Sequence, residues 1–258
     1  GGLDYAVDQY NDKLLTQAGQ GWNSNGWFVV NNAWGSSALT AGVDYTLQSA
    51  FSTSNMTHGT TFNWSYPLTT TDLRVMAYPE LIFGTSPHNA AGNPTDTSKV
   101  FPVQVSNLSK LTVDYDLSYA GNKGGFNVAY DIWFANSPTG TGTAAVTTEL
   151  MIWLHKGGFE PGGTVVGTYT NGDFSATIYH TGTYTALVAD KEWTQGSIDV
   201  ADIISTLKAM GIMSDSEYLR SIELGAEVAS GTGSLTVNDL QINVETKDAS
   251  GASTAVTI

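Results

Sequence analysis

The chain has 258 residues, of which 41% are hydrophobic, so it can bury the core of a single all-β domain. Its 24 acidic and 10 basic residues give a formal net charge of −14, which argues against nucleic acid and anionic membranes as partners because both require a basic surface. The absence of cysteine excludes disulfides and thiolate metal sites.

Short apolar or aromatic runs separated by Gly, Asn, Asp, Ser and Pro make up most of the sequence. This pattern is typical of antiparallel strands joined by turns. In chain order, the expected strands are residues 27–34, 60–66, 73–83, 110–120, 126–135, 149–155, 165–170, 174–180, 184–189, 218–228 and 235–246. About eleven strands in one domain predict two stacked sheets or a jelly roll.

One segment, SIDVADIISTLKAMG, has a helical period instead. Ser197 or Asp199 is a candidate N-cap and Gly211 a candidate terminator. We expect a helix over about residues 199–210 that packs against the outside of one sheet. Its apolar positions are Val200, Ile203, Ile204, Leu207 and Met210.

The remaining segments show no period. Residues 85–98 are rich in turn formers and predict a loop, and residues 248–258 predict a polar tail or the start of a linker. Residues 1–247 are therefore expected to form one domain. No run approaches the roughly 18–20 apolar residues of a membrane helix, and the first ten residues do not resemble a signal peptide, so we expect a processed or trimmed chain.

A carboxylate begins one of the most apolar runs, TTELMIWLHKGG, at residues 147–158. Because side chains alternate along a strand, Leu150 and Ile152 are expected to point into the core, with Glu149, Met151 and Trp153 on the opposite face. An acidic residue on an outer face is ordinarily solvated. A carboxylate in line with a thioether and an indole is also a plausible lining for a groove.

Other segments repeat this arrangement. Asp131 and Trp133 share a face of their strand, Asn32 and Trp34 share another, and Glu227 lies opposite apolar neighbours in IELGAEV. Indoles stack on sugar rings, amides bind hydroxyl groups, and paired acids cleave glycosidic bonds. Together these faces predict a carbohydrate cleft on a curved sheet.

The segments VVNNAWG, VMAYPEL, VAYDIWF, TELMIWL and IELGAEVASG, in this order, resemble glycoside hydrolase family 12, whose members are small endo-β-1,4-glucanases and xyloglucanases. The resemblance covers roughly residues 25–245, and TELMIWL is its most specific part. It implies an all-β jelly-roll sandwich of two antiparallel sheets, with one α-helix packed on the convex side and an open substrate cleft on the concave side.

The resemblance also implies site residues. Glu149 matches the nucleophile and Glu227 the general acid/base, so their carboxyl groups are expected about 5–5.5 Å apart, with ionised Glu149 raising the pKa of Glu227. Asp131 matches an aspartate that orients the nucleophile by sharing a proton with it. The matching substrate-binding residues are Asn32, Trp34, Tyr78, Met151 and Trp153.

Some positions depart from the family pattern. Val228 and Ala229 follow Glu227 where the family often has Pro and an aromatic residue, so acceptor-side contacts are expected to differ. Glu80 shares the face of Tyr78 and is expected at the rim of the cleft. Glu223 lies about 13 Å along the strand from Glu227 and is expected to be peripheral.

The sequence therefore predicts a secreted, monomeric, retaining endo-β-1,4-glucanase that acts on cellulose-type or mixed-linkage β-glucan without metal or cofactor. The four histidines show no metal-binding spacing. Two alternatives remain open. One is a xyloglucan-specific enzyme of the same fold, a distinction that depends on loops such as 85–98. The other is a non-catalytic carbohydrate-binding jelly roll, which would not need paired acids.

Overall fold

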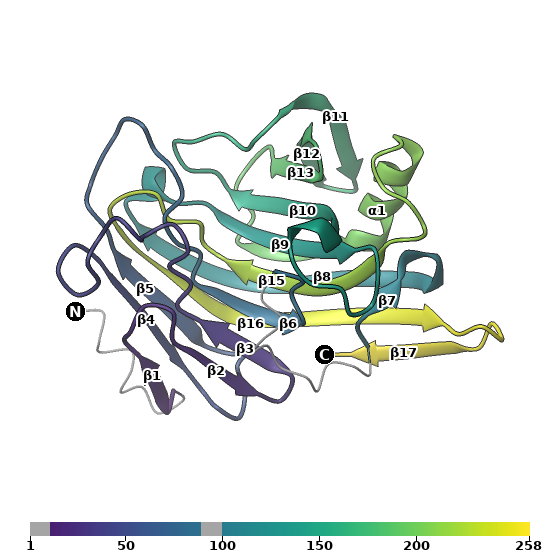
Figure 1. Cartoon of the computed structure of the whole chain (residues 1–258), viewed down its shortest axis with the longest axis horizontal. Helices are drawn as coiled ribbons and strands as arrows, with labels where there is room; N and C mark the ends of the chain where they lie inside the picture. The colour runs from purple at the N-terminus through teal and green to yellow at the C-terminus, as the bar shows by residue number, and fades with distance from the viewer. Residues whose placement is uncertain (1–10, 89–99) are drawn as a thin grey trace.

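The computed structural model describes residues 11–88 and 100–258, which form two sheets packed face to face (Figure 1). The seven-stranded sheet contains, in spatial order, β1 (Lys13–Leu15), β4 (Thr46–Phe51), β5 (Thr60–Ser65), β16 (Thr232–Lys247), β8 (Leu108–Gly121) and β14 (Gln195–Asp199), with β17 (Ser253–Thr257) paired to β16.

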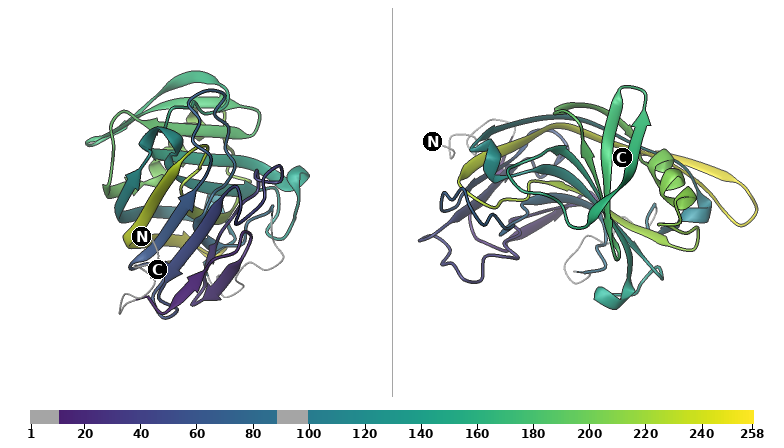
Figure 2. Two further views of the ribbon diagram at one scale, coloured as in Figure 1. Left: turned by 90° about the vertical axis from the view of Figure 1, so that its left-hand side faces the viewer. Right: turned by 90° about the horizontal axis from the view of Figure 1, so that it is seen from above.

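The ten-stranded sheet forms the other layer. It contains β11 (Thr164–Asn171), β12 (Phe174–Thr181), β13 (Tyr184–Ala189), β10 (Val146–His155), β9 (Val128–Ala135), β15 (Tyr218–Gly225), β6 (Glu80–Gly84), β3 (Trp27–Val30) and β2 (Gly21–Ser24), with β7 (Val103–Gln104) paired to β15. The long strands curve along their length (Figure 2). The predicted jelly-roll sandwich of two sheets is confirmed.

Strand pairing follows the expected antiparallel pattern with one exception. Strands β10 and β13 are parallel, whereas the other named pairs within the described residues are antiparallel. Short 3-10 turns connect several strands, at Val105–Asn107, Lys123–Gly125 and Thr143–Ala145.

Side-chain alternation places the core between the sheets. In β9, Tyr130, Ile132 and Phe134 are fully buried in the shared core, whereas Asp131 and Trp133 line a cavity on the opposite face. Leu150, Ile152 and Leu154 of β10 belong to the same core. The faces predicted for these two strands are therefore confirmed, and the ten-stranded sheet carries the cleft.

Several strands were not predicted. These are β1, β2, β4, β7, β14 and β17, all short and several of them rich in polar residues. Within the expected strand 73–83, only residues from Glu80 onward form strand β6, although Ala77 makes an isolated bridge to Val228. Sheet pairing, rather than an apolar run, defines such elements.

The expected tail is a hairpin arm instead. Strand β17 pairs antiparallel with β16, and the turn between them is closed by Asp248, whose Oδ1 accepts hydrogen bonds from the backbone N–H groups of Ser250 and Ala252. Gly251 adopts a φ of 84° in this turn. Pairing with β16 satisfies backbone groups that a linker would leave to water.

The predicted helix is confirmed as α1 (Val200–Ala209), the one α-helix among the described residues. Its buried Val200, Ile203, Ile204 and Leu207 belong to the core shared by the sheets. Asp202 accepts a hydrogen bond from the hydroxyl of Tyr169 on β11. The helix therefore contacts both sheets near the end of β14 and does not pack on the convex sheet alone.

Residues 89–98 of the predicted loop 85–98 lie outside the described residues. Within the described ranges, no helix combines the length and apolar character needed to cross a bilayer.

Of the two candidate caps, Asp199 caps the helix, because its Oδ1 accepts a hydrogen bond of 3.0 Å from the backbone N–H of Asp202. Asp199→Ala is expected to lower the free energy of unfolding by about 1 kcal/mol. Ser197→Ala, two residues earlier and exposed, is the matched control and should change it by less than about 0.5 kcal/mol. Urea unfolding of both variants measures the difference, and equal values would contradict the assignment.

Candidate active site

The register of three strands brings two carboxyl groups together on the open face of the ten-stranded sheet. Asp131 lies directly opposite Met151 and Glu223, and Glu149 lies opposite Trp133. Glu149 and Asp131 are therefore diagonal neighbours on adjacent strands. Their side chains are hydrogen-bonded to each other, which requires a proton between the two carboxyl groups.

A second carboxyl pair repeats this geometry two strands away. Glu80 on β6 lies opposite Gly225, which makes it the diagonal neighbour of Glu223 on β15. These two side chains are also hydrogen-bonded to each other. Four carboxyl groups, Glu149, Asp131, Glu223 and Glu80, thus follow one diagonal across β10, β9, β15 and β6; we call them the carboxyl row.

Glu227 lies just beyond the end of β15 and is held by Asn127. The Asn127 Nδ2 group donates a hydrogen bond of 2.8 Å to Glu227 Oε1, and Asn127 Oδ1 accepts one of 2.9 Å from the backbone N–H of Glu227. Asn127 is fully buried, directly before β9. Because both ends of its amide are bonded to Glu227, Asn127 fixes where that carboxyl group points.

These acids face one cavity of about 560 Å³. Its lining includes the predicted catalytic residues and three of the predicted substrate-binding residues, together with other side chains from the same face: Gly19, Val30, Asn32, Trp34, Tyr78, Glu80, Ile82, Ser86, His88, Asp131, Trp133, Glu149, Glu223 and Glu227. The structure therefore brings together residues that are far apart in sequence.

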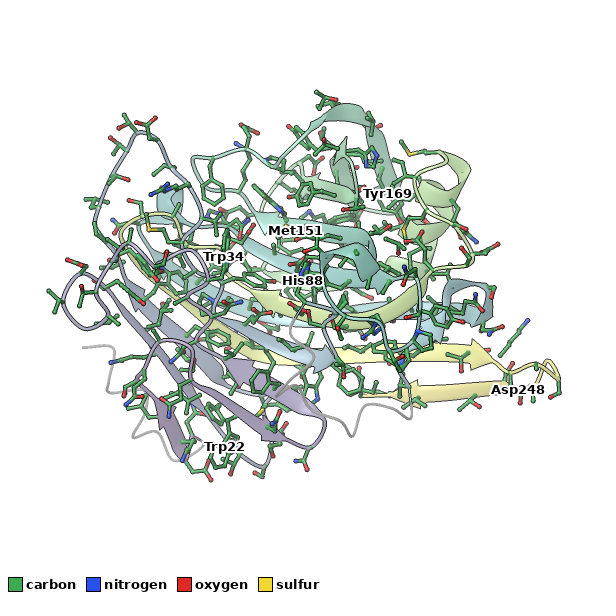
Figure 3. The ribbon with its side chains drawn as sticks, viewed as in Figure 1. Trp22, Trp34, His88, Met151, Tyr169 and Asp248 are labelled. Atoms are coloured by element: carbon green, nitrogen blue, oxygen red, sulfur yellow. The ribbon has the colours of Figure 1, made fainter. Side chains whose placement is uncertain are left out.

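Aromatic side chains form part of this lining. The indole of Trp34 is 63% exposed, as expected for a platform that stacks on a sugar ring. The rings of His88 and Trp133 meet edge to face with centroids 4.3 Å apart. Figure 3 shows Trp34 and His88 near the centre of the molecule, whereas Trp22 lies at its lower edge. Tyr78 is buried, and its hydroxyl donates a hydrogen bond to the carbonyl oxygen of Ala129.

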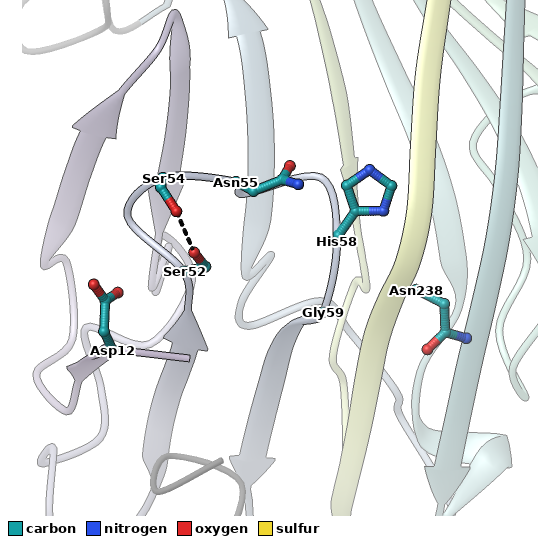
Figure 4. Close-up of a pocket in the computed structure, with 7 residues that line it drawn as sticks. All are labelled: Asp12, Ser52, Ser54, Asn55, His58, Gly59 and Asn238. Atoms are coloured by element: carbon teal, nitrogen blue, oxygen red, sulfur yellow. Dashed lines mark hydrogen bonds between the residues drawn. The ribbon is translucent and has the colours of Figure 1, made fainter. Parts of the chain in front are cut away.

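A second cavity, of about 580 Å³, lies elsewhere, near the turn that follows β4 (Figure 4). It is lined by Asp12, Ser52, Ser54, Asn55, His58, Gly59 and Asn238. Both oxygens of its single carboxylate, Asp12, already accept hydrogen bonds from Thr53. This cavity has neither paired acids nor an aromatic platform, so its chemistry does not match that of a glycosidase site.

Two predicted substrate-binding residues do not reach the cavity. Met151 and Trp153 lie on the predicted face, but each is only 2% exposed. Phe159 packs against Trp153, and the Tyr184 hydroxyl donates a hydrogen bond to the Met151 sulfur. These neighbours cover that end of the sheet, so the assignment of Met151 and Trp153 to direct substrate contact is wrong for this structure.

The expected positions of Glu80 and Glu223 are also corrected. Glu80 is 1% exposed and Glu223 is 4% exposed, so neither is a rim or peripheral residue. Distance along a single strand suggested that Glu223 is remote from the site. Pairing between strands instead places it directly opposite Asp131.

Burial dominates the electrostatics of the site. It raises the pKa of Glu149 to about 7; the hydrogen bond from Asp131 opposes this rise, and the charges of Glu227 and Glu223 add to it. The pKa of Glu227 is also raised, but the cause is burial and not the charge of Glu149 that was expected to raise it, and the Asn127 hydrogen bond opposes the rise. Burial and the neighbouring charge of Glu149 raise the pKa of Asp131 well above its usual value. Carboxylic acids therefore retain protons here at pH values where exposed ones have lost them.

Sequence reasoning did not assign Asn127 to the site. Its position next to VAYDIWF offers no period or motif, and only its contact with Glu227 reveals its role. Trp133 was recognised as sharing a face with Asp131 but was not assigned to substrate binding.

The chain is similar in sequence to a known protein family and to several of its members. The family model described as glycosyl hydrolase family 12 matches residues 25–245. Endoglucanase S of Pectobacterium parmentieri is 27% identical over 236 residues, which cover 87% of this chain and 84% of that protein. Xyloglucan-specific endo-beta-1,4-glucanase 1 of Phytophthora sojae is 25% identical over 232 residues, with coverage of 86% and 87%.

The fold is shared with solved structures. The family 12 xyloglucanase of Bacillus licheniformis matches with a TM-score of 0.75 at 23% identity, over 90% of this chain and 99% of that one. At this identity, the match establishes the common architecture.

Removal of the Asn127 amide is expected to raise the pKa of Glu227 further, because the N–H donor that stabilises the ionised carboxylate is lost. The variant Asn127→Leu tests this by NMR titration of 13C-labelled glutamate side chains. Asn122→Leu is the control, since Asn122 bonds to Thr232 and to no carboxylate. A folded Asn127→Leu protein with an unchanged or lowered Glu227 pKa would contradict the assignment.

Proposed function

Because the chain belongs to glycosyl hydrolase family 12, we propose that it is an endo-β-1,4-glucanase that hydrolyses internal bonds of cellulose-type or mixed-linkage β-glucan with retention of configuration. The observation that carries this proposal is the convergence of Glu149, on β10, and Glu227, just beyond β15, on one cavity, with Asp131 bonded to the former. A non-catalytic sugar-binding domain has no need for such a pair.

In the first step, the Glu149 carboxylate attacks the anomeric carbon, and a covalent glycosyl-enzyme forms as the glycosidic bond breaks. Glu227 gives its proton to the departing oxygen, so the leaving sugar departs as a neutral alcohol. In the second step, Glu227 takes a proton from water, and that water displaces Glu149 from the anomeric carbon. The sugar keeps its original configuration, and both carboxyl groups return to their starting states.

The surroundings of the two acids support this division of roles. A carboxyl proton on Asp131 is donated to Glu149 and stabilises its ionised form, as a nucleophile requires. Burial raises the pKa of Glu227, as a proton donor requires. The hydrogen bond from Asp131 lowers the pKa of Glu149, whereas burial and the charge of Glu227 raise it, so the ionisation of Glu149 is linked to that of Glu227.

Binding of a polymer is supported by the breadth of the lining. The cavity collects side chains from β3, β6, β9, β10 and β15, so it extends across several neighbouring strands. Trp34 and Asn32 lie at the β3 side of it.

A polysaccharide cannot cross a membrane intact, which supports the further proposal that the enzyme acts outside the cell. We also expect it to act as a monomer.

Glu149→Gln and Glu227→Gln should each fold normally and lose on the order of a thousandfold or more of the hydrolysis rate on β-glucan, since each removes a group that changes its bonding during the reaction. Glu160→Gln is the control, because Glu160 is exposed and pairs with Lys156. Reducing-sugar release measures all three. Substantial residual hydrolysis in either of the first two variants would refute the assignment.

The same proposal fixes the stereochemistry of chemical rescue. Azide should restore turnover to Glu149→Gly and give a glycosyl azide of inverted configuration, because a single displacement remains. A product of retained configuration would show that Glu149 is not the nucleophile.

A xyloglucan-specific enzyme is the second candidate, favoured by the relative of that name in Phytophthora sojae. Initial rates on carboxymethyl cellulose, barley β-glucan and xyloglucan decide between the candidates. We expect the unbranched glucans to be cleaved faster. A rate on xyloglucan more than about tenfold higher would replace the first proposal with the second, since a tenfold ratio in kcat/KM corresponds to a clear difference in transition-state binding.

A further inference from the structure

We propose that Glu80 and Glu223 form a positioning pair that holds one proton, and that this proton fixes the amide of Asn32 for sugar binding. The proposal rests on the proposed function, because Asn32 is a sugar-binding residue only if the cavity binds a glucan. Catalysis by Glu149 and Glu227 leaves the second carboxyl pair without a role.

Counting donors and acceptors identifies the protonated member. Glu223 is hydrogen-bonded by the Ser221 hydroxyl, at 2.8 Å from its Oε2, and by the side chain of Trp133. An indole N–H can only donate, so Glu223 is the acceptor in that contact. With two donors already directed at it, Glu223 is stabilised as a carboxylate, and its third partner is Glu80.

Glu80 has the complementary arrangement. Its Oε2 accepts a hydrogen bond of 2.7 Å from Asn32 Nδ2, whereas its Oε1 is buried and faces no N–H or hydroxyl donor. If Glu80 were ionised, it would be repelled by the neighbouring Glu223 carboxylate, and its buried Oε1 would have no hydrogen-bond donor. A proton on Glu80, donated to Glu223, satisfies both side chains.

The hydrogen bonds continue from Glu80 to the aromatic platform. Asn32 Oδ1 accepts a hydrogen bond of 3.1 Å from the backbone N–H of Trp34, which fixes the amide orientation and directs Nδ2 toward Glu80. The second N–H of this amide remains for a sugar hydroxyl. A series of hydrogen bonds therefore links the centre of the carboxyl row to the residue that carries the exposed indole. It runs through Glu223, Glu80, Asn32 and Trp34.

Loss of the shared proton breaks this series of hydrogen bonds. The ionisable groups that face Glu80 are Glu223 on β15, Glu227 just beyond it, and Tyr78 on its own segment. Asp131 on β9 and Glu149 on β10 continue the row behind Glu223. The neighbouring strand β3, Trp-Phe-Val-Val, has no ionisable side chain to compensate. When the pH rises, two adjacent carboxylates repel, Glu80 moves away, and Asn32 loses its partner.

The substitution Glu80→Gln distinguishes the effect of the titrating proton from the effect of the hydrogen bonds. A glutamine at this position accepts from Asn32 through its oxygen and donates to Glu223 through its nitrogen, yet it has no proton to lose. Glu80→Ala removes both contacts. The probe is a cellotetraose whose glycosidic oxygens are replaced by sulfur, so that binding is measured without cleavage.

Calorimetric titration over a series of increasing pH values should show the wild-type affinity for this probe falling by roughly tenfold relative to Glu80→Gln as the pair loses its proton. Glu80→Gln should bind like the wild type at the lower pH and lack that fall. Glu80→Ala should bind roughly tenfold more weakly throughout. Glu217→Gln is the matched control, a buried carboxylate outside the cavity that accepts from Thr148 and Ser214, and it should behave as the wild type.

Either of two results would overturn the proposal: full affinity in Glu80→Ala, or the same fall with pH in Glu80→Gln as in the wild type. If Glu80→Ala does not fold, Glu80→Gln alone decides. A protein that neither binds the probe nor hydrolyses any β-glucan would refute the proposed function instead. NMR titration of 13C-labelled glutamate then tests the shared proton without substrate, because the pKa of Glu80 must lie well above that of an exposed glutamate, and an ordinary acidic midpoint would refute the proposal.

Discussion

Two hydrogen bonds between carboxyl groups allow four buried acids to lie side by side on the concave face. One joins Asp131 to Glu149, and the other joins Glu80 to Glu223. Four acids buried side by side on adjacent strands would repel if all were ionised, and burial alone penalises each charge. Each pair retains a proton and therefore carries one negative charge instead of two. Two amides on the same face donate hydrogen bonds to carboxyl groups: Asn127 donates to Glu227, and Asn32 donates to Glu80.

The sandwich makes this crowded face possible. Tyr130 and Ile132 alternate with Asp131 and Trp133 along β9, so the same backbone that buries an apolar core also projects the acids into the cavity. A glycoside hydrolase of this kind needs carboxyl groups held to within a fraction of an ångström. A sheet packed on one face by a continuous core provides that precision, because no strand can shift without disturbing the core.

The two carboxyl pairs divide the tasks of the site along one diagonal. The pair at β10 and β9 contains the proposed nucleophile, and the pair at β15 and β6 contacts the amide of Asn32, which precedes the exposed indole of Trp34. Their shared geometry explains why proton loss at one end would be felt at the other. Glu223 lies directly opposite Asp131, and its charge raises the pKa of both Asp131 and Glu149.

The sequence by itself determined the β-rich class, a helix at about residues 199–210, the faces of β9 and β10, and, through ordered motifs, the family. Each of these is set by local alternation, spacing or residue type. Only the tertiary structure decided that β17 pairs with β16, that Phe159 and Tyr184 cover Trp153 and Met151, and that Glu80 meets Glu223. Those outcomes depend on which strands become neighbours, and alternation along one strand contains no information about the strand beside it.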